Sequence, residues 1–121
     1  MGRLMQLEER VVGEVTIIAL SGRMIRNDHF GDLTQRVRDL VRAGRRKLVL
    51  DLGAVSYMDS MCLGEIVSGL VTVRNQGGTL HLANLTERVE RLMTVAGLTS
   101  VFQTFGSEQE AVRSLADMSE S

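Results

Sequence analysis

Apolar positions along the chain follow two spacings in turn, which predicts short strands alternating with amphipathic helices. Residues 14–21 (EVTIIALS) and 47–52 (KLVLDL) are rich in β-branched and aliphatic side chains, as buried strands are. Weaker apolar patterns predict further strands over 5–12, 79–83 and 101–104. The first two strands of the chain, 5–12 and 14–21, meet at a tight turn, which predicts a hairpin.

Between the later strands, apolar side chains recur at helical spacing and predict three helices, followed by a fourth over 107–118. We expect Asn27 or Asp28 to cap the first helix and Thr86 to cap the third, while Gly44 and Gly97 follow their ends. The three apolar stripes are Phe30, Leu33, Val37, Leu40 and Val41; Leu63, Ile66, Val67, Leu70 and Val73; and Val89, Leu92, Met93 and Ala96.

The resulting order β-β-α-β-α-β-α-β-α predicts one α/β domain over 1–121, with its core at about 5–117. Helical crossovers make the later strands parallel, so the expected sheet is mixed, with four to five strands and helices packed on it. The segments that follow the second, third and fourth strands should gather at one end of this sheet. That end is where open α/β sheets place their ligand and partner sites.

Composition narrows the range of functions. The 121 residues hold 14 Lys and Arg against 15 Asp and Glu, a formal net charge of −1, so neither a nucleic-acid nor an anionic-lipid partner is expected. The longest apolar run is too short to span a membrane, and the N-terminus has no signal-peptide pattern. A single cysteine excludes an intrachain disulfide and fits the cytoplasm. We therefore expect a cytoplasmic protein.

The sequence shows no chemistry typical of an enzyme. It has no phosphate loop, dinucleotide fingerprint or nucleophile elbow, and its two histidines and one cysteine cannot form a zinc site by themselves. We expect no cofactor. His29 and His81 have no catalytic partner at a recognisable spacing, and the basic run 45–47 is typical of a solvated turn.

The stretch 57–64 (YMDSMCLG), between the third strand and the second helix, carries the functional signal. Asp59 and Ser60 stand where a helix cap belongs, and capping alone would account for both. Alternatively, Ser60 accepts a phosphate, which the start of a helix tolerates and which would add about −1.5 to −2 charges beside Asp59. The pattern of residues by itself favours capping.

Flexible apolar side chains gather at the same predicted end of the sheet. Met58 and Met61 flank the serine, and Met24 and Ile25 follow the second strand. They form either a surface for a partner or a buried layer under the helix, and the sequence leaves both open. Cys62 is either a reactive thiol at a helix start or an inert, part-buried one, and its apolar neighbours favour the second.

These residues resemble a known family. Met58-Asp59-Ser60 followed by Leu63-Gly64 and Ile66 is similar to the signature of STAS domains, the fold of bacterial anti-sigma factor antagonists. The resemblance spans about residues 11–115 in the order that the fold requires. It includes the further segments Leu20-Ser21-Gly22, Leu50-Asp51-Leu52, Gly77-Gly78, Ala96-Gly97-Leu98 and Val101-Phe102.

The resemblance implies an antagonist that is not an enzyme and that works by exchanging partners. Its unphosphorylated form would bind an anti-sigma factor that is also a serine kinase, and so release the sigma factor. Phosphorylation at Ser60 would end binding, and a serine phosphatase would reset the cycle. The partner surface would consist of Asp59, Met58, Met61, Met24, Ile25 and Arg23. The sequence leaves open whether the chain also forms a weak homodimer.

Two departures from the family pattern leave an alternative. Gly22-Arg23-Met24-Ile25 stands where family members often carry Gly-Glu-Leu-Asp, and Met61-Cys62 replaces a small residue and a glycine. Arg23 either changes which kinase is recognised or pairs with a phosphate on Ser60. The alternative function is a phosphorylation-independent scaffold or accessory subunit in a signalling or transport complex.

Overall fold

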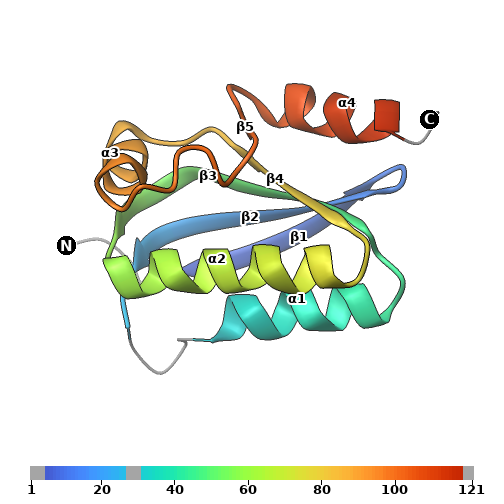
Figure 1. The fold of residues 1–121 in the computed structure, drawn as a ribbon, viewed down its shortest axis with the longest axis horizontal. Helices are drawn as coiled ribbons and strands as arrows, with labels where there is room; N and C mark the ends of the chain where they lie inside the picture. Colours follow the sequence, from blue (N-terminus) through green and yellow to red (C-terminus); the bar gives the residue numbers. More distant parts are fainter. Residues whose placement is uncertain (1–4, 27–30, 119–121) are drawn as a thin grey trace.

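The computed structural model describes residues 5–26 and 31–118, which form one sheet with helices on both faces (Figure 1). The elements are β1 (Gln6–Val12), β2 (Val15–Met24), α1 (Asp32–Arg42), β3 (Lys47–Met58), α2 (Ser60–Asn75), β4 (Thr79–Ala83), α3 (Glu87–Val95), β5 (Thr104–Phe105) and α4 (Glu108–Met118). This order and the five-stranded mixed sheet confirm the predicted α/β architecture.

The strands lie side by side in the order β1-β2-β3-β4-β5. β1 and β2 form an antiparallel hairpin, whereas β2, β3, β4 and β5 are parallel, as their helical crossovers require. One register shift between β2 and β3 leaves Leu52 and Gly53 opposite Leu20 alone, which is a β-bulge in β3. The Gly53 N–H, displaced by this bulge, donates to Asp51 Oδ1 at 2.9 Å.

α1 and α2 pack together over one face of the sheet and enclose the main core (Figure 1). Leu33, Val37 and Leu40 from α1 meet Ile66 and Leu70 from α2, all at most 7% exposed. α3 adds Val89 and Met93 at the edge of this core. The amphipathic stripes of the sequence therefore predicted most of the buried positions of the three helices. Ala96 is an exception, because it is exposed at the end of α3, and Phe30 lies outside the described residues.

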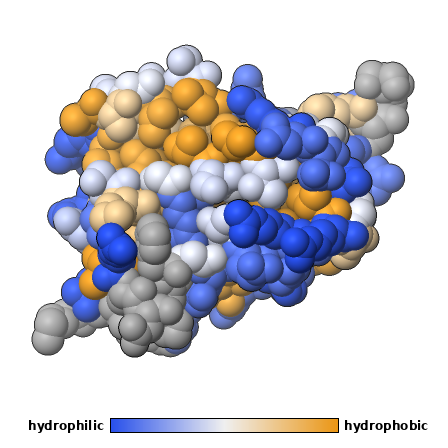
Figure 2. Space-filling model, turned by 60° about the horizontal axis from the view of Figure 1, so that its bottom comes forward, coloured by the Kyte–Doolittle hydropathy of each residue, from blue (hydrophilic) through white to orange (hydrophobic). Residues whose placement is uncertain are grey.

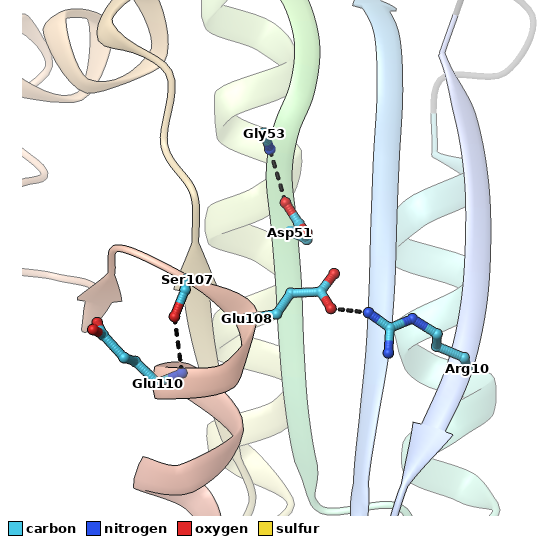
Figure 3. A network of polar contacts seen from close by, with 6 residues as sticks. All are labelled: Arg10, Asp51, Gly53, Ser107, Glu108 and Glu110. Carbon is cyan, nitrogen blue, oxygen red and sulfur yellow. Dashed lines mark hydrogen bonds and ion pairs between the residues drawn. The ribbon is translucent and has the colours of Figure 1, made fainter.

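α4 covers the opposite face and buries much less apolar surface. The buried side chains there are Val15, Ile17, Val49, Ala83, Ala111 and Leu115. An ion pair adds to this attachment, because Glu108 at the start of α4 pairs with Arg10 on β1 (Figure 3). The helix start itself is capped by Ser107, whose Oγ accepts the Glu110 N–H at 3.1 Å. His81 on β4 lies under the same helix, with its Nδ1 2.9 Å from Ser114 Oγ.

Helix ends follow their local signals where the structure describes them. Thr86 caps α3 by accepting the Val89 N–H at 3.2 Å, and Gly44 and Gly97 adopt positive φ just after α1 and α3. The N-cap of α1 is Gly31, so the predicted start was too early; Asn27 and Asp28 lie outside the described residues.

Three predicted strands had wrong bounds. β2 runs on to Met24 instead of ending at 21, so Met24 belongs to the strand and does not follow it. β3 runs on to Met58 instead of ending at 52, because the parallel pairing of the two strands continues to the pair Met24 and Met58. β5 is a two-residue strand, Thr104–Phe105, instead of 101–104, since only Leu82 and Ala83 of β4 pair with it. The expected loop 57–64 is therefore the end of a strand, one cap residue and the start of a helix.

Candidate functional site

The candidate site is the junction of β2, β3 and α2, which Asp59 holds together. Asp59 is the N-cap of α2: its Oδ1 accepts the Cys62 N–H at 2.8 Å, and its Oδ2 accepts the Arg26 N–H at 3.1 Å. Its own N–H donates to the Met24 carbonyl at 3.0 Å. One residue thus fixes the helix start to the ends of two strands, as the predicted gathering of strand ends requires.

The Asp59 carboxylate is stabilised in its charged form. Burial by itself would raise its pKa, but hydrogen bonds from Cys62, Arg26 and Met61 outweigh that effect and hold the pKa below the ordinary 3.8. Asp59 is therefore ionised at neutral pH and places a negative charge beside Ser60.

Ser60 is the first residue of α2 and its side chain is exposed. The two candidate cap residues thus have separate positions, because Asp59 makes the cap and Ser60 follows it. A hydroxyl at this place is open to a modifying enzyme. It also lies at the positive end of the helix dipole, which favours a negative group.

The predicted apolar partner surface is divided by the fold. Met24 and Met58 are 1% and 3% exposed and belong to the main core, so they correspond to the buried alternative and present no surface here. They are buried because they are the last paired positions of β2 and β3, beneath α2. Met61 is 46% exposed and Ile25 is partly exposed.

Arg23 and Arg26, which follow each other closely at the end of β2, point to different parts of the structure. Met24 points into the core beneath α2, and side chains alternate along a strand, so the preceding Arg23 projects toward the opposite face. Sequence reasoning missed Arg26, whose Nη1 lies 3.7 Å from Met61 Sδ. A signal was present, because Arg26 directly follows the apolar pair 24–25, but its place depends on the bond to Asp59.

Cys62 is an inert thiol in this structure. It is 3% exposed, and burial, together with the hydrogen bond and charge of Asp59 and the charge of Glu65, raises the pKa of Cys62 to about 12. The structure favours the inert, buried alternative, because burial, and after it the negative neighbours, oppose formation of the thiolate.

Glu65 is a buried carboxylate that the sequence did not reveal. It is 6% exposed, and its Oε2 accepts the Thr34 N–H at 3.1 Å and lies 3.4 Å from the Thr34 hydroxyl. This bond ties the first turn of α1 to α2 close to Met61. A glutamate on a helix of this sequence gives no sign of burial, since its partner lies 31 residues away.

The remaining predictions concern residues away from this junction. His81 is buried and bonded to Ser114, a structural role, whereas His29 lies outside the described residues. Within residues 5–26 and 31–118, no group of His, Cys, Asp and Glu is arranged to hold a metal ion. No helix among those residues is long and apolar enough to cross a membrane.

Comparison with known proteins assigns the fold. The family model of the STAS domain matches residues 6–111, so the chain belongs to the STAS domain family. A crystal structure of an anti-sigma factor antagonist from Mycobacterium paratuberculosis superposes with a TM-score of 0.81 at 19% identity, covering 93% of this chain and 95% of that one. The phosphorylated form of Bacillus SpoIIAA gives a TM-score of 0.68 at 21% identity, covering 90% and 96%.

Sequence comparison with named proteins gives further similar chains. The anti-sigma-B factor antagonist of Bacillus subtilis (strain 168) is 41% identical over 59 residues, which cover 49% of this chain and 54% of that protein. The chain thus matches about half the length of this relative. The anti-sigma F factor antagonist of Paenibacillus polymyxa is 26% identical over 113 residues, 92% of this chain and 95% of the relative. These names describe regulatory proteins and agree with the expectation that the chain is not an enzyme.

Proposed function

We propose that the chain is a cytoplasmic anti-sigma factor antagonist that binds an anti-sigma factor of the serine-kinase class. Phosphorylation of Ser60 by that kinase would end binding, and a serine phosphatase would restore it. The single observation that carries this proposal is the position of Ser60, exposed at the first residue of α2 beside the ionised Asp59. The relatives named above, and SpoIIAA solved in both phosphorylated and unphosphorylated forms, support it.

The docking face we propose is the solvent side of α2. Ser60, Gly64, Val67 and Val71 follow at helical spacing and share one face of the helix, over about 16 Å from first to last. Val71 is 49% exposed and Val67 is partly exposed, which leaves apolar surface on a helix in line with the serine.

This apolar surface continues beyond α2. The Arg74 side chain at the end of α2 donates to the Val101 carbonyl at 3.1 Å, which brings the segment after α3 next to the helix. Leu98 and Val101 in that segment are only partly buried, and Val95 at the end of α3 is 83% exposed. Figure 2, in which the side bearing α1 and α2 comes forward, shows hydrophobic surface gathered in one broad area. An apolar area of this kind on a small domain is typical of a protein interface.

A phosphate on Ser60 would act directly on this face. With Asp59 ionised next to it, the start of α2 would carry a charge of roughly −2.5 to −3. Docking would then bury a strongly hydrated charge, and a loss of about 3 kcal/mol of binding free energy would weaken the complex more than 100-fold. The fold would be kept, because Asp59 continues to cap the helix.

The test is reconstitution with the anti-sigma factor kinases of the source organism. Ser60→Ala should bind with wild-type affinity and stay bound in the presence of ATP, while Ser60→Asp should bind at least tenfold more weakly. Gln109→Glu adds the same charge on α4, on the opposite face, and should bind like wild type.

Mass spectrometry of the wild-type protein after incubation with kinase and ATP should place one phosphate on Ser60. A complex that forms equally with Ser60→Ala and Ser60→Asp, and no phosphate on Ser60, would contradict the switch. Those results would instead support the phosphorylation-independent scaffold.

A further inference from the structure

A cavity lies away from Ser60, between α3 and β5. Its volume is about 720 Å³, within the range of small-molecule sites, and its wall includes Gly53, Asn84, Glu90, Met93 and Phe105. It opens beside the carboxyl ends of β4 and β5, where parallel sheets place ligands. None of the contacts described for Asp59, Arg26 or Glu65 reaches it.

The backbone departs from regular geometry at this cavity. The β-bulge of β3 places Gly53 on the wall, and the bond from its N–H to Asp51 fixes that position (Figure 3). A Cβ on Gly53 would stand 3.0 Å from Asn84 Cβ, so glycine permits this close approach without a shift of the neighbouring residues. Asn84 itself has a φ of 58°, the one positive value of a non-glycine residue in the described part of the chain. Such irregular positions concentrate where a fold forms a site.

The charges around the cavity select the kind of ligand. Glu90 is the one charged residue among its described lining residues, and no Lys, Arg or His belongs to them. Two more carboxylates stand behind the glycines of the wall: Asp51 next to Gly53, and Glu110, whose Oε2 is 3.7 Å from the place of a Gly106 side chain. An anion such as a nucleotide would meet like charges here, whereas a cation would be attracted.

The cavity also offers apolar contacts and hydrogen bonds. Met93 and the Phe105 ring supply a surface on which an apolar or aromatic group can pack, and a cation near a ring gains further attraction. The Asn84 amide and the hydroxyls of Thr99 and Thr104 supply donors and acceptors. A metal ion does not fit, because the described carboxylates do not converge into a coordinating group.

We propose that this cavity binds a small organic amine with an apolar or aromatic body, its ammonium group on Glu90 and its body against Met93 and Phe105. This site is independent of the proposed phosphorylation of Ser60. The domain would then respond to a second signal, a small molecule bound at the α3–β5 edge.

The experiment is an amide-resolved NMR titration of the whole chain with phenethylamine. The matched probes are 3-phenylpropionate, which has a carboxylate in place of the amine, and 2-phenylethanol, which has neither charge. The amides of Gly53, Asn84 and Gly106 should shift with the amine, and the carboxylate should bind at least tenfold more weakly. Equal binding of amine and carboxylate, or no shift at these amides with millimolar amine, overturns the proposal.

Two variants and one control separate the site from general effects. Glu90→Gln should bring the affinity for the amine down to that for the alcohol, while Glu87→Gln, on the same helix with a 92% exposed side chain, should leave it unchanged. Gly106→Leu should fill the cavity and abolish binding of all three probes, since only the flexible end of Glu110 lies near that position. Amine binding that survives both Glu90→Gln and Gly106→Leu overturns the assignment. None of these measurements depends on Ser60, so they stand apart from the kinase test.

Discussion

The two faces of the sheet differ in how much apolar surface they bury and in how far they depend on polar contacts. The face under α1 and α2 encloses a deep apolar core to which every parallel strand except β5 contributes, with two helices packed against each other. The face under α4 has a small core and relies on polar contacts, namely the Arg10–Glu108 pair and the bond between His81 and Ser114. Stability therefore rests mainly on the first face, and α4 on the second face is expected to open while the rest of the fold persists.

The sharpest test of this comparison is one large-to-small substitution in each core. Ile66→Ala, at a side chain 1% exposed, should lower the free energy of unfolding by about 2–5 kcal/mol and reduce hydrogen-exchange protection throughout the sheet. Leu115→Ala, at a side chain 0% exposed, should release α4 alone and leave α1 and α2 protected. If α1 and α4 lose protection together in Leu115→Ala, the two faces form one cooperative unit and the comparison is wrong.

Removing the cap at the start of α2 should have a smaller effect, on the stable face. Asp59→Ala should lower the free energy of unfolding by about 1 kcal/mol, and Asp59→Asn, which still caps, by less. The folded pKa of Asp59 lies below its ordinary value of 3.8, so its contribution is complete above that pH and is lost as the pH falls through the folded pKa. Urea unfolding over this acidic range should show a weaker pH dependence in Asp59→Ala than in wild type. An identical pH dependence in both would contradict the role given to Asp59.

The smallest expected effect lies on the α4 face and near neutral pH. Burial lowers the folded pKa of His81 below its ordinary 6.5, so the unfolded chain takes up the proton first and stability falls as the pH drops below that value. Because His81 bonds Ser114 and lies against Phe105, its protonation should loosen α4 before any carboxylate titrates. The protection factors of the α4 amides, in which the intrinsic pH dependence of exchange is divided out, should fall just below pH 6.5 in wild type and stay constant in His81→Gln. An equal fall in both proteins would remove His81 from this role.

Local signals were sufficient for much of the fold. The order of the elements, the cap at Thr86 and the glycines after α1 and α3 were predicted, because each depends on a few neighbouring residues. The length of β3 was not, since residues 53–58 show no strand pattern and are held in the sheet by pairing with β2. Tertiary pairing, which a single sequence does not display, decided that boundary.

The same distinction applies to the candidate site. Asp59 and Ser60 were singled out at the right place, but their division of roles depends on which oxygen meets which N–H. The burial of Met24 and Met58 follows from strand register, and the positions of Glu65 and Arg26 follow from partners more than 30 residues away. Residue type indicated a helix cap and a hydroxyl at this junction, and the fold determined which side chains are available there.

Separate residues start the helix and offer the hydroxyl, and this arrangement bears on how such a protein evolves. Asp59 makes the side-chain cap of α2, so selection for folding acts on its codon, and under the proposed function selection for regulation would act on the next codon. Replacing Ser60 would leave the helix start intact, so a lineage could lose or regain the proposed control by phosphorylation through a single substitution. Such regulation would drift without any change in architecture.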